Sequence, residues 1–193
     1  RHTGAAHHST LGRLACRVAG EAFCRGADVT LVYGPGTAVP PPAVRTLSVR
    51  TYQEMRDAVL RLATEERFDV AIMAAAVLDF VPETVEQGKR SSAQGWAVTL
   101  VPTEKIIDRL PPALPRVAFK LESGRSEAEL LEIGRPLLAR DNTWAVVAGN
   151  LEGVGPGEAQ ESWVLTPAAT HVCRTKGEIA ERILEGLAGR FSS

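Results

Sequence analysis

The segment 74–80, Ala-Ala-Ala-Val-Leu-Asp-Phe, follows a predicted buried strand and contains one acid. Its small side chains would let a ligand reach main-chain donors and acceptors, which can read the edge of a nucleobase. Asp79 would then stand at the mouth of the sheet. The competing interpretation is a tightly packed strand end in which Asp79 caps a turn or a helix. The segment is therefore a candidate nucleotide site that needs support from other segments.

A polar, glycine-bearing stretch, 81–96, lies between two apolar runs and carries the adjacent cations Lys89 and Arg90. This composition is typical of a flap that closes over a ligand and excludes water. A lysine at its tip could neutralise the charge that grows on a pyrophosphate leaving group. A solvated basic loop explains the same composition without any function, so both interpretations stay open.

Two further predicted strands end in side chains that can bind or orient a polar ligand. One carries Lys120 and Glu122, and the next carries Gly149 and Asn150. An asparagine at a strand end offers both a donor and an acceptor to a substrate amide. It serves equally well in turn chemistry, so Asn150 is a candidate only.

The opening stretch 7–15 places a glycine and hydroxyls directly before a predicted helix. Free amide groups and the helix dipole attract anions such as phosphate at that position. The stretch is neither a Gly-x-Gly-x-x-Gly fingerprint nor a Walker loop ending in Lys-Ser or Lys-Thr, which disfavours dehydrogenase and P-loop functions. His7 and His8 lack a third metal ligand nearby, so loop residues are a better interpretation than a metal site.

The apolar pattern along the chain predicts the elements that position these segments. Apolar residues at helical spacing alternate with short apolar runs typical of strands buried on both faces. This alternation predicts βαβ units and right-handed crossovers. We therefore expect an α/β fold, a single Rossmann-like domain over residues 1–193 with a mainly parallel sheet and helices on both faces. Helices are expected over 11–25, 51–66, 103–110, 126–140 and 175–189, and strands over 28–33, 44–49, 69–76, 97–101, 116–121, 144–149 and 162–166.

Ligands of such sheets bind outside the carboxyl ends of the strands. The segments 34–36, 74–80, 120–123 and 148–152 all follow predicted strands. The fold would thus gather the unusual residues at one edge of the sheet.

The composition fits one soluble domain and limits its partners. The 193 residues are 45% hydrophobic and 23% charged, with a formal net charge of -1 and no long basic run, which predicts neither a nucleic-acid nor a membrane partner. The three cysteines lack zinc-site spacing, and Cys16 and Cys24 are expected to be buried thiols in a reducing cytoplasm. No signal peptide or membrane span is evident. The chain begins at Arg1, so a longer parent protein stays open.

Taken in order, the segments resemble the phosphopantothenate–cysteine ligase family, the synthetase domain of the DNA/pantothenate metabolism flavoproteins. No single piece is specific, but their order and spacing are, and the likeness extends from about Leu14 to Leu187. The matching pieces are RGADVTLVYGP (25–35), the Pro-rich loop, VRTYQEM (49–55), AAAVLDF (74–80), Lys89 ten positions beyond Asp79, TEKII (103–107), FKLES (119–123) and VVAGNLE (146–152).

The resemblance implies a two-step ligase reaction in coenzyme A biosynthesis. The carboxylate of 4′-phosphopantothenate attacks the α-phosphate of CTP or ATP and releases pyrophosphate, and the amine of cysteine then attacks the acyl nucleotidylate. The resemblance also implies Mg²⁺ as a cofactor, no flavin in this chain, a homodimer, and a decarboxylase that is either separate or fused.

The resemblance assigns roles to individual residues as well. It places the base and ribose against Ala75 to Phe80, with Mg²⁺ near Asp79, whose oxygens suit a hard cation. It places the triphosphate against Lys89 and the substrate phosphate near Gly12. The full implied sets are Ala75, Ala76, Asp79, Phe80, Lys89, Lys105 and Phe119 for the nucleotide, and Thr10, Gly12, Gly149 and Asn150 for the substrate.

One functional residue of the family has no counterpart in this chain. Family members carry an Arg…Asn-x-Ser-Ser-Gly-x-x-Gly motif whose Asn stabilises the acyl intermediate, and this chain lacks that Asn and the strand before it. In one register His8 takes its place, and in another Ala5 does. The strand-end Asn of the family falls at Gly149, with Asn150 one position late. The candidate catalytic residues are accordingly Lys89 and, covering for the missing Asn, His8 or Asn150.

Three functions stay open on the sequence. The first is an active ligase, and the second is a nucleotide-binding paralogue with an altered substrate or no activity. The third is an unrelated Rossmann-like oxidoreductase, which is disfavoured because the glycine fingerprint and a ribose-binding acid do not occur at the required spacing.

Overall fold

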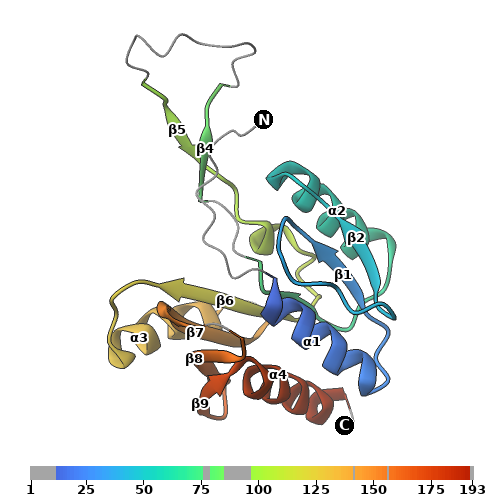
Figure 1. Ribbon diagram of the computed structural model, residues 1–193, viewed down its shortest axis with the longest axis vertical. Helices are drawn as coiled ribbons and strands as arrows, with labels where there is room; N and C mark the ends of the chain where they lie inside the picture. Colours follow the sequence, from blue (N-terminus) through green and yellow to red (C-terminus); the bar gives the residue numbers. More distant parts are fainter. Residues whose placement is uncertain (1–11, 76–78, 85–96, 141, 156, 192–193) are drawn as a thin grey trace.

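The structure is a computed structural model, and its helices and strands alternate along much of the chain (Figure 1). It describes residues 12–75, 79–84, 97–140, 142–155 and 157–191. The helices are α1 (Arg13–Cys24), α2 (Tyr52–Glu65), α3 (Glu127–Leu138) and α4 (Lys176–Phe191), with the 3-10 helix η1 (Ile106–Arg109). The strands are β1 (Thr30–Tyr33), β2 (Arg45–Ser48), β3 (Ala71–Met73), β4 (Phe80–Pro82), β5 (Leu100–Pro102), β6 (Arg116–Glu122), β7 (Thr143–Val154), β8 (Ala159–Leu165) and β9 (Thr170–Thr175).

The central sheet has five strands in the order β3-β6-β7-β8-β9. The strands β3, β6 and β7 run parallel, whereas β8 and β9 continue the sheet antiparallel. A second, parallel pair is formed by β1 and β2. The strands β4 and β5 form an antiparallel ribbon that extends away from the body of the molecule (Figure 1). The α/β class with parallel central strands is therefore confirmed. The antiparallel orientation of β8 and β9 was not part of the prediction.

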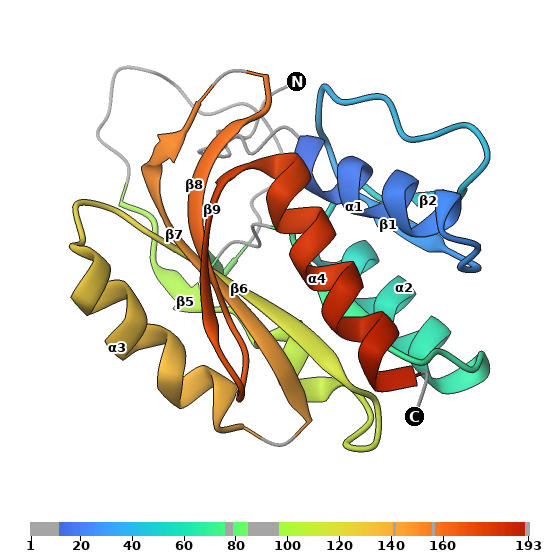
Figure 2. The same cartoon turned by 90° about the horizontal axis from the view of Figure 1, so that it is seen from below.

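Helices cover both faces of the central sheet, as Figure 2 shows. On one face α1 and α4 pack on each other and on β6, β7 and β8, with Ile179 and Ile183 fully buried. On the other face α3 packs through Leu130 against Ala118, Val146 and Ala148. Successive side chains of a strand point to opposite faces, so β6 and β7 contribute to both clusters and read as continuous apolar runs.

Local sequence signals explain where the helices begin. Thr51 caps α2 by accepting a hydrogen bond from the backbone N–H of Glu54, and Ser126 and Glu129 form a capping box at the start of α3. Along α1, buried side chains recur at Leu14, Val18 and Ala22, which is the spacing that a helix needs to cover a sheet.

Several element boundaries differ from the prediction. The strand expected over 69–76 pairs only as β3, and the short helix expected over 103–110 is the 3-10 helix η1. The ribbon strand β4 and the edge strand β9 were not predicted. The expectation that Cys24 is buried is wrong, because this last residue of α1 is exposed, whereas Cys16 is buried. In the described part of the chain, no helix combines the length and apolar character that a membrane span requires.

Candidate functional site

The carboxyl ends of β3, β6 and β7 meet at one edge of the sheet, as the parallel register requires. Met73 lies opposite Ala118, and Lys120 lies opposite Ala148. Lys120 therefore lies two residues beyond the last residue of β6 that pairs with β3. This edge brings together the described parts of three of the four predicted segments: the start of 74–80, which follows β3, the segment 120–123 at the end of β6, and the segment 148–152, which lies inside β7.

The segment after β3 is linked to the segment that carries Lys105. The main-chain carbonyl of Asp79 accepts a hydrogen bond from the N–H of Thr103 at 2.8 Å. Ala75, Asp79 and Lys105 are exposed, and the exposed fraction of Phe80 is 56%. Four predicted nucleotide residues are thus open to solvent, and this bond joins the two segments that carry them.

Two side chains fix the segment around Lys105. The hydroxyl of Tyr52, at the start of α2, donates to the main-chain carbonyl of Glu104 at 2.5 Å. The buried guanidinium of Arg116 donates to the carbonyls of Ile107 at 2.8 Å and Pro111 at 3.1 Å. Sequence reasoning missed both residues, because the contact partner of Tyr52 is 52 residues away and those of Arg116 are main-chain atoms.

Gly12 and Phe119 lie on the face that α1 and α4 cover. Phe119 packs against the same apolar cluster as Leu14. Gly12 is the N-cap of α1 with φ 71°, and a Cβ there would approach Tyr33 Oη to 2.7 Å. The glycine thus lets the start of α1 lie against the tyrosine at the end of β1.

Lys120 and Glu122 form an ion pair at the carboxyl end of β6. Their Nζ and Oε1 atoms are 2.8 Å apart, and the exposed fractions of the two side chains are 33% and 25%. Residues two apart on a strand share a face, so both side chains lie on the same face as Ala118, which α3 covers farther along the sheet. Lys120 and Phe119 therefore leave the strand on opposite faces.

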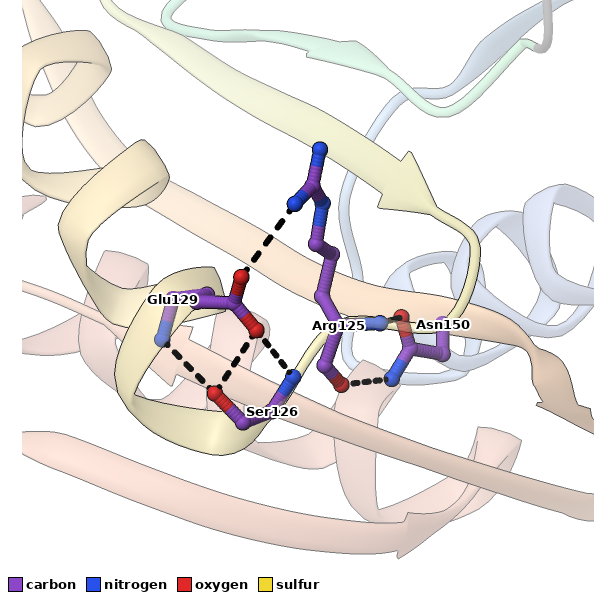
Figure 3. Close-up of polar contacts among 4 residues, drawn as sticks. All are labelled: Arg125, Ser126, Glu129 and Asn150. Carbon is purple, nitrogen blue, oxygen red and sulfur yellow. Dashed lines mark hydrogen bonds and ion pairs between the residues drawn. The ribbon is translucent and has the colours of Figure 1, made fainter.

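Asn150 contacts the loop between β6 and α3 through both ends of its amide (Figure 3). Its Oδ1 accepts a hydrogen bond from the backbone N–H of Arg125 at 3.1 Å, and its Nδ2 donates to the Arg125 carbonyl at 2.5 Å. The guanidinium of Arg125 is in turn paired with Glu129 at 3.2 Å. The amide that was predicted to orient a substrate is thus engaged in holding this loop.

Glu152, two residues after Asn150, holds the same loop. Its carboxylate accepts hydrogen bonds from the Ser123 hydroxyl and from the Gly124 N–H, the latter at 3.3 Å. These bonds, the Ser123 hydroxyl first, hold the pKa of Glu152 below its ordinary value. The role of Glu152 was not predicted from the sequence. Its spacing of two residues from Asn150 indicates that both side chains share a face of the strand, but this spacing cannot show that the face contacts the loop after β6.

Gly149 is required by packing. A Cβ at this buried position would lie 2.7 Å from the Ser162 hydroxyl and 3.0 Å from the Glu161 carbonyl. The close approach of β8 therefore explains this glycine without a ligand.

Four predicted site residues, His8, Thr10, Ala76 and Lys89, lie outside the described residues. Within the described ranges, no group of three or more His, Cys, Asp or Glu side chains is arranged to hold a metal ion. Asp79 supplies one exposed carboxylate. Mg²⁺ usually binds through one or two carboxylates plus substrate phosphates and retained waters, so this donor set fits it.

A groove of about 540 Å³ lies at the opposite end of the parallel strands. It is bordered by Trp144 at the start of β7, the turn between β8 and β9, and the stretch of α4 from Arg182 to Arg190. None of the predicted site residues borders it. The chemistry of the strand ends, rather than the size of this groove, defines the candidate site.

Comparisons with known proteins agree with the likeness seen in the sequence. The chain matches the family model of the DNA/pantothenate metabolism flavoprotein C-terminal domain over residues 5–190. The coenzyme A biosynthesis bifunctional protein CoaBC of Thermococcus kodakarensis is 36% identical over 180 residues, which are 91% of this chain and 44% of the relative. The chain thus spans less than half the length of that relative.

Solved structures show the same fold. The crystal structure of the C-terminal domain of a coenzyme A biosynthesis bifunctional protein CoaBC superimposes with a TM-score of 0.74 and 24% identity, covering 95% of this chain and 84% of that chain. A Cab2 mutant in complex with phosphopantothenate-cysteine gives a TM-score of 0.65 with 16% identity, covering 94% of this chain and 78% of that chain.

Proposed function

Since the chain belongs to the family of DNA/pantothenate metabolism flavoprotein C-terminal domains, we propose that it joins 4′-phosphopantothenate to cysteine in coenzyme A biosynthesis. The observation that carries this proposal is the match over residues 5–190, together with 36% identity to a bifunctional protein of that pathway. The complex of a structural relative with phosphopantothenate-cysteine supports the choice of substrates. The extent of the match also supports residues 1–193 as one synthetase-like domain.

The proposed reaction consumes one nucleoside triphosphate in two steps. A carboxylate oxygen of 4′-phosphopantothenate forms a bond to the α-phosphorus while the bond to the bridging β-phosphate oxygen breaks, and pyrophosphate leaves. The amine of cysteine then forms the amide bond, the nucleoside monophosphate leaves, and the amine gives up a proton. CTP and ATP both satisfy this chemistry, because the reaction takes place at the α-phosphate that they share. Backbone contacts at the strand end would select between the two bases.

The proposed nucleotide contacts come from two described segments and from Lys89, which lies outside the described residues. Ala75, two residues after β3, and Phe80, the first residue of β4, are both exposed and suit contact with base and ribose. Lys105 is exposed on the segment that is hydrogen-bonded to Asp79 through Thr103, which suits contact with phosphate oxygens. Lys89 would add a further cation from the flap.

Asp79 would hold Mg²⁺ together with the phosphate oxygens. When bound, the ion supplies neutralisation of the charge that grows on the phosphate oxygens. Lys105 and Lys89 would neutralise charge on the same group, and closure of the flap would exclude water.

Two partners are part of the proposal. A second copy of the chain would cover the ribbon of β4 and β5, whose Phe80 and Leu100 are each 56% exposed. A decarboxylase, fused or separate, would supply the second activity that the word bifunctional in the relative's name implies. No flavin is expected to bind the domain described here.

The test is release of pyrophosphate from CTP or ATP by the purified chain with Mg²⁺. Release is expected only when phosphopantothenate and cysteine are both present, with the amide product identified by mass spectrometry. A Lys89→Ala change should lower turnover by about 10²-fold, because a lost transition-state contact costs about that much. An unchanged rate would remove Lys89 from the mechanism.

A nucleotide-binding paralogue is the second candidate, and one observation favours it. The family's Asn has no counterpart before α1, and the amide of Asn150 is already engaged with Arg125. If neither nucleotide supports turnover while one of them still binds in calorimetry, the paralogue stands and the ligase does not.

A further inference from the structure

The ion pair between Lys120 and Glu122 differs from the other charged pairs of the molecule. Among ion pairs between described residues, it alone uses a lysine; the other cations are arginines. The whole chain has 22 basic residues, of which only Lys89, Lys105, Lys120 and Lys176 are lysines. An ordinary surface cation in this protein is therefore an arginine, and Lys120 departs from that usage.

The position of Lys120 gives it access to a ligand. It lies near the end of β6, the strand between β3 and β7, where parallel sheets bind their ligands. In the register its neighbour on β7 is Ala148. The small side chain of Ala148 leaves space around the ammonium, and the Lys120 side chain is 33% exposed.

The backbone that carries this pair is held from β7. Glu122 lies opposite Asn150 in the register, and the loop after Glu122 is hydrogen-bonded to both Asn150 and Glu152. The backbone of Glu122 is thereby held in place, and its carboxylate binds the Lys120 ammonium at 2.8 Å when no ligand is present. A cation that is held in place before binding loses less freedom when it binds.

A lysine suits an exchange of partners. Its ammonium is a compact point charge on a flexible stem, whereas an arginine is committed to a planar fork. A phosphate or carboxylate oxygen that arrives at the strand end offers the ammonium the same kind of charge-assisted hydrogen bond as Glu122.

We propose that Lys120 binds an anionic oxygen of a substrate, a phosphate or a carboxylate, and that Glu122 is the stand-in that holds the ammonium until the substrate arrives. This inference rests on the proposed function and adds a substrate-binding residue to it. The oxygen belongs either to the nucleoside triphosphate or to phosphopantothenate, and separate experiments with each compound distinguish the two sources.

The test measures how fast an amine-acetylating reagent modifies each lysine of the folded chain, by peptide mass spectrometry. It is run with Mg²⁺ and, in turn, no ligand, CTP, ATP or phosphopantothenate. At about ten times Kd, the compound that Lys120 binds should slow its modification about tenfold, because only about one site in eleven stays free. Lys176 is only 2% exposed and reports that the protein has stayed folded.

Two variants separate binding from a merely structural ion pair. Lys120→Met should raise KM for the protecting compound about 10- to 100-fold, the cost of a lost charge-assisted hydrogen bond. Glu122→Gln should leave that KM unchanged or lower it, because the ammonium has lost its competing partner. A structural pair would respond alike to both changes. Arg140→Met is the matched control, because Arg140 pairs with Asp108 at the same 2.8 Å but precedes the start of β7.

The outcomes are distinct. If pyrophosphate release proceeds and Lys105 is protected while Lys120 is not, the inference is overturned and the proposed function stands. Equal effects of Lys120→Met and Glu122→Gln on KM overturn it as well. If no compound protects any lysine and no pyrophosphate is released, the inference and the proposed function both fail.

Discussion

Gly12 combines a left-handed backbone with a close side-chain neighbour. Its φ is 71°, and a Cβ would lie 2.5 Å from Cε2 and 2.7 Å from Oη of Tyr33. We expect Gly12→Ala to lower the free energy of unfolding by about 2–3 kcal/mol, since the alanine is strained and the tyrosine must move. Urea unfolding followed by circular dichroism measures the change.

Gly26 provides the matched control for this prediction. Its φ is 87°, but a Cβ at this position would meet no other atom within 4 Å. Gly26→Ala should therefore cost only the backbone strain, about 1–2 kcal/mol. Equal losses in the two variants would show that contact with Tyr33 does not matter.

The buried thiol of Cys173 makes stability depend on alkaline pH. Burial and, to a smaller extent, Glu178 raise its pKa from the ordinary 9.0 to about 11. The unfolded thiol ionises above pH 9 while the folded one stays protonated, so the stabilisation is complete below pH 9 and is lost between pH 9 and 11. The loss in the free energy of unfolding should be on the order of 2 kcal/mol.

Cys173→Ala isolates this contribution. The variant should be less stable at about pH 8 because a buried side chain is truncated, but it should lose less stability between pH 9 and 11 than the wild-type chain. Burial lowers the pKa of Lys176, an effect of opposite sign that is present in both proteins and cancels in the comparison. Cys24→Ala, at an exposed position, should retain the full alkaline loss.

At the scale of elements, Arg116 joins the start of β6 to the segment around η1. Its guanidinium is buried and donates to the Ile107 and Pro111 carbonyls, while its Nε has no hydrogen-bond partner. Arg116→Met would leave both carbonyls without this donor, so we expect a loss of about 2–4 kcal/mol in the free energy of unfolding. Amide hydrogen exchange over 106–110 should accelerate.

The control for Arg116 is Arg109→Met. Arg109 forms an exposed ion pair with Glu104 at 2.8 Å, and such pairs contribute at most about 1 kcal/mol. Arg109→Met should therefore leave amide hydrogen exchange over 106–110 nearly unchanged. If the two variants exchange alike, Arg116 does not hold the segment.

The helices and the central strands were predictable because the local spacing of their apolar residues shows which side chains are buried. The continuous apolar run of β7 and the spacing of Leu14, Val18 and Ala22 in α1 need no knowledge of the partner element. The strand β9 gave a weak signal, because only Cys173 is buried among its six residues and its pairing with β8 is set by the fold.

The sheet edge that gathers the candidate residues was predictable from the sequence, but the contacts of those residues were not. Strand ends in a parallel sheet point to the edge where Ala75 and Lys120 lie. The engagement of Asn150 with Arg125 could not be foreseen, because it depends on a loop 25 residues away in the sequence. A polar residue at a strand end gives the same sequence pattern whether its side chain binds a ligand or a loop of the same chain.

At the scale of the whole molecule, the ribbon of β4 and β5 has an apolar face without a cover among the described residues. Phe80 lies opposite Pro102 and Pro82 lies opposite Leu100, and all four side chains are exposed on one face. An isolated two-stranded ribbon is marginally stable in water. A second copy of the chain that buries this face would stabilise it by removing apolar surface from water.

We therefore expect Leu100→Asp to convert the proposed dimer into a monomer, because burying an unpaired carboxylate at the interface is unfavourable. Sedimentation equilibrium at micromolar concentration measures the change. Leu100 is chosen over Phe80 because Phe80 is also a proposed nucleotide contact. Val172→Asp places the same charge on an exposed valine of the edge strand β9, where 49% of the residue is accessible, and should leave the dimer intact. A monomer in the wild-type chain, or a dimer that survives Leu100→Asp, would show that the apolar face of the ribbon is covered in some other way.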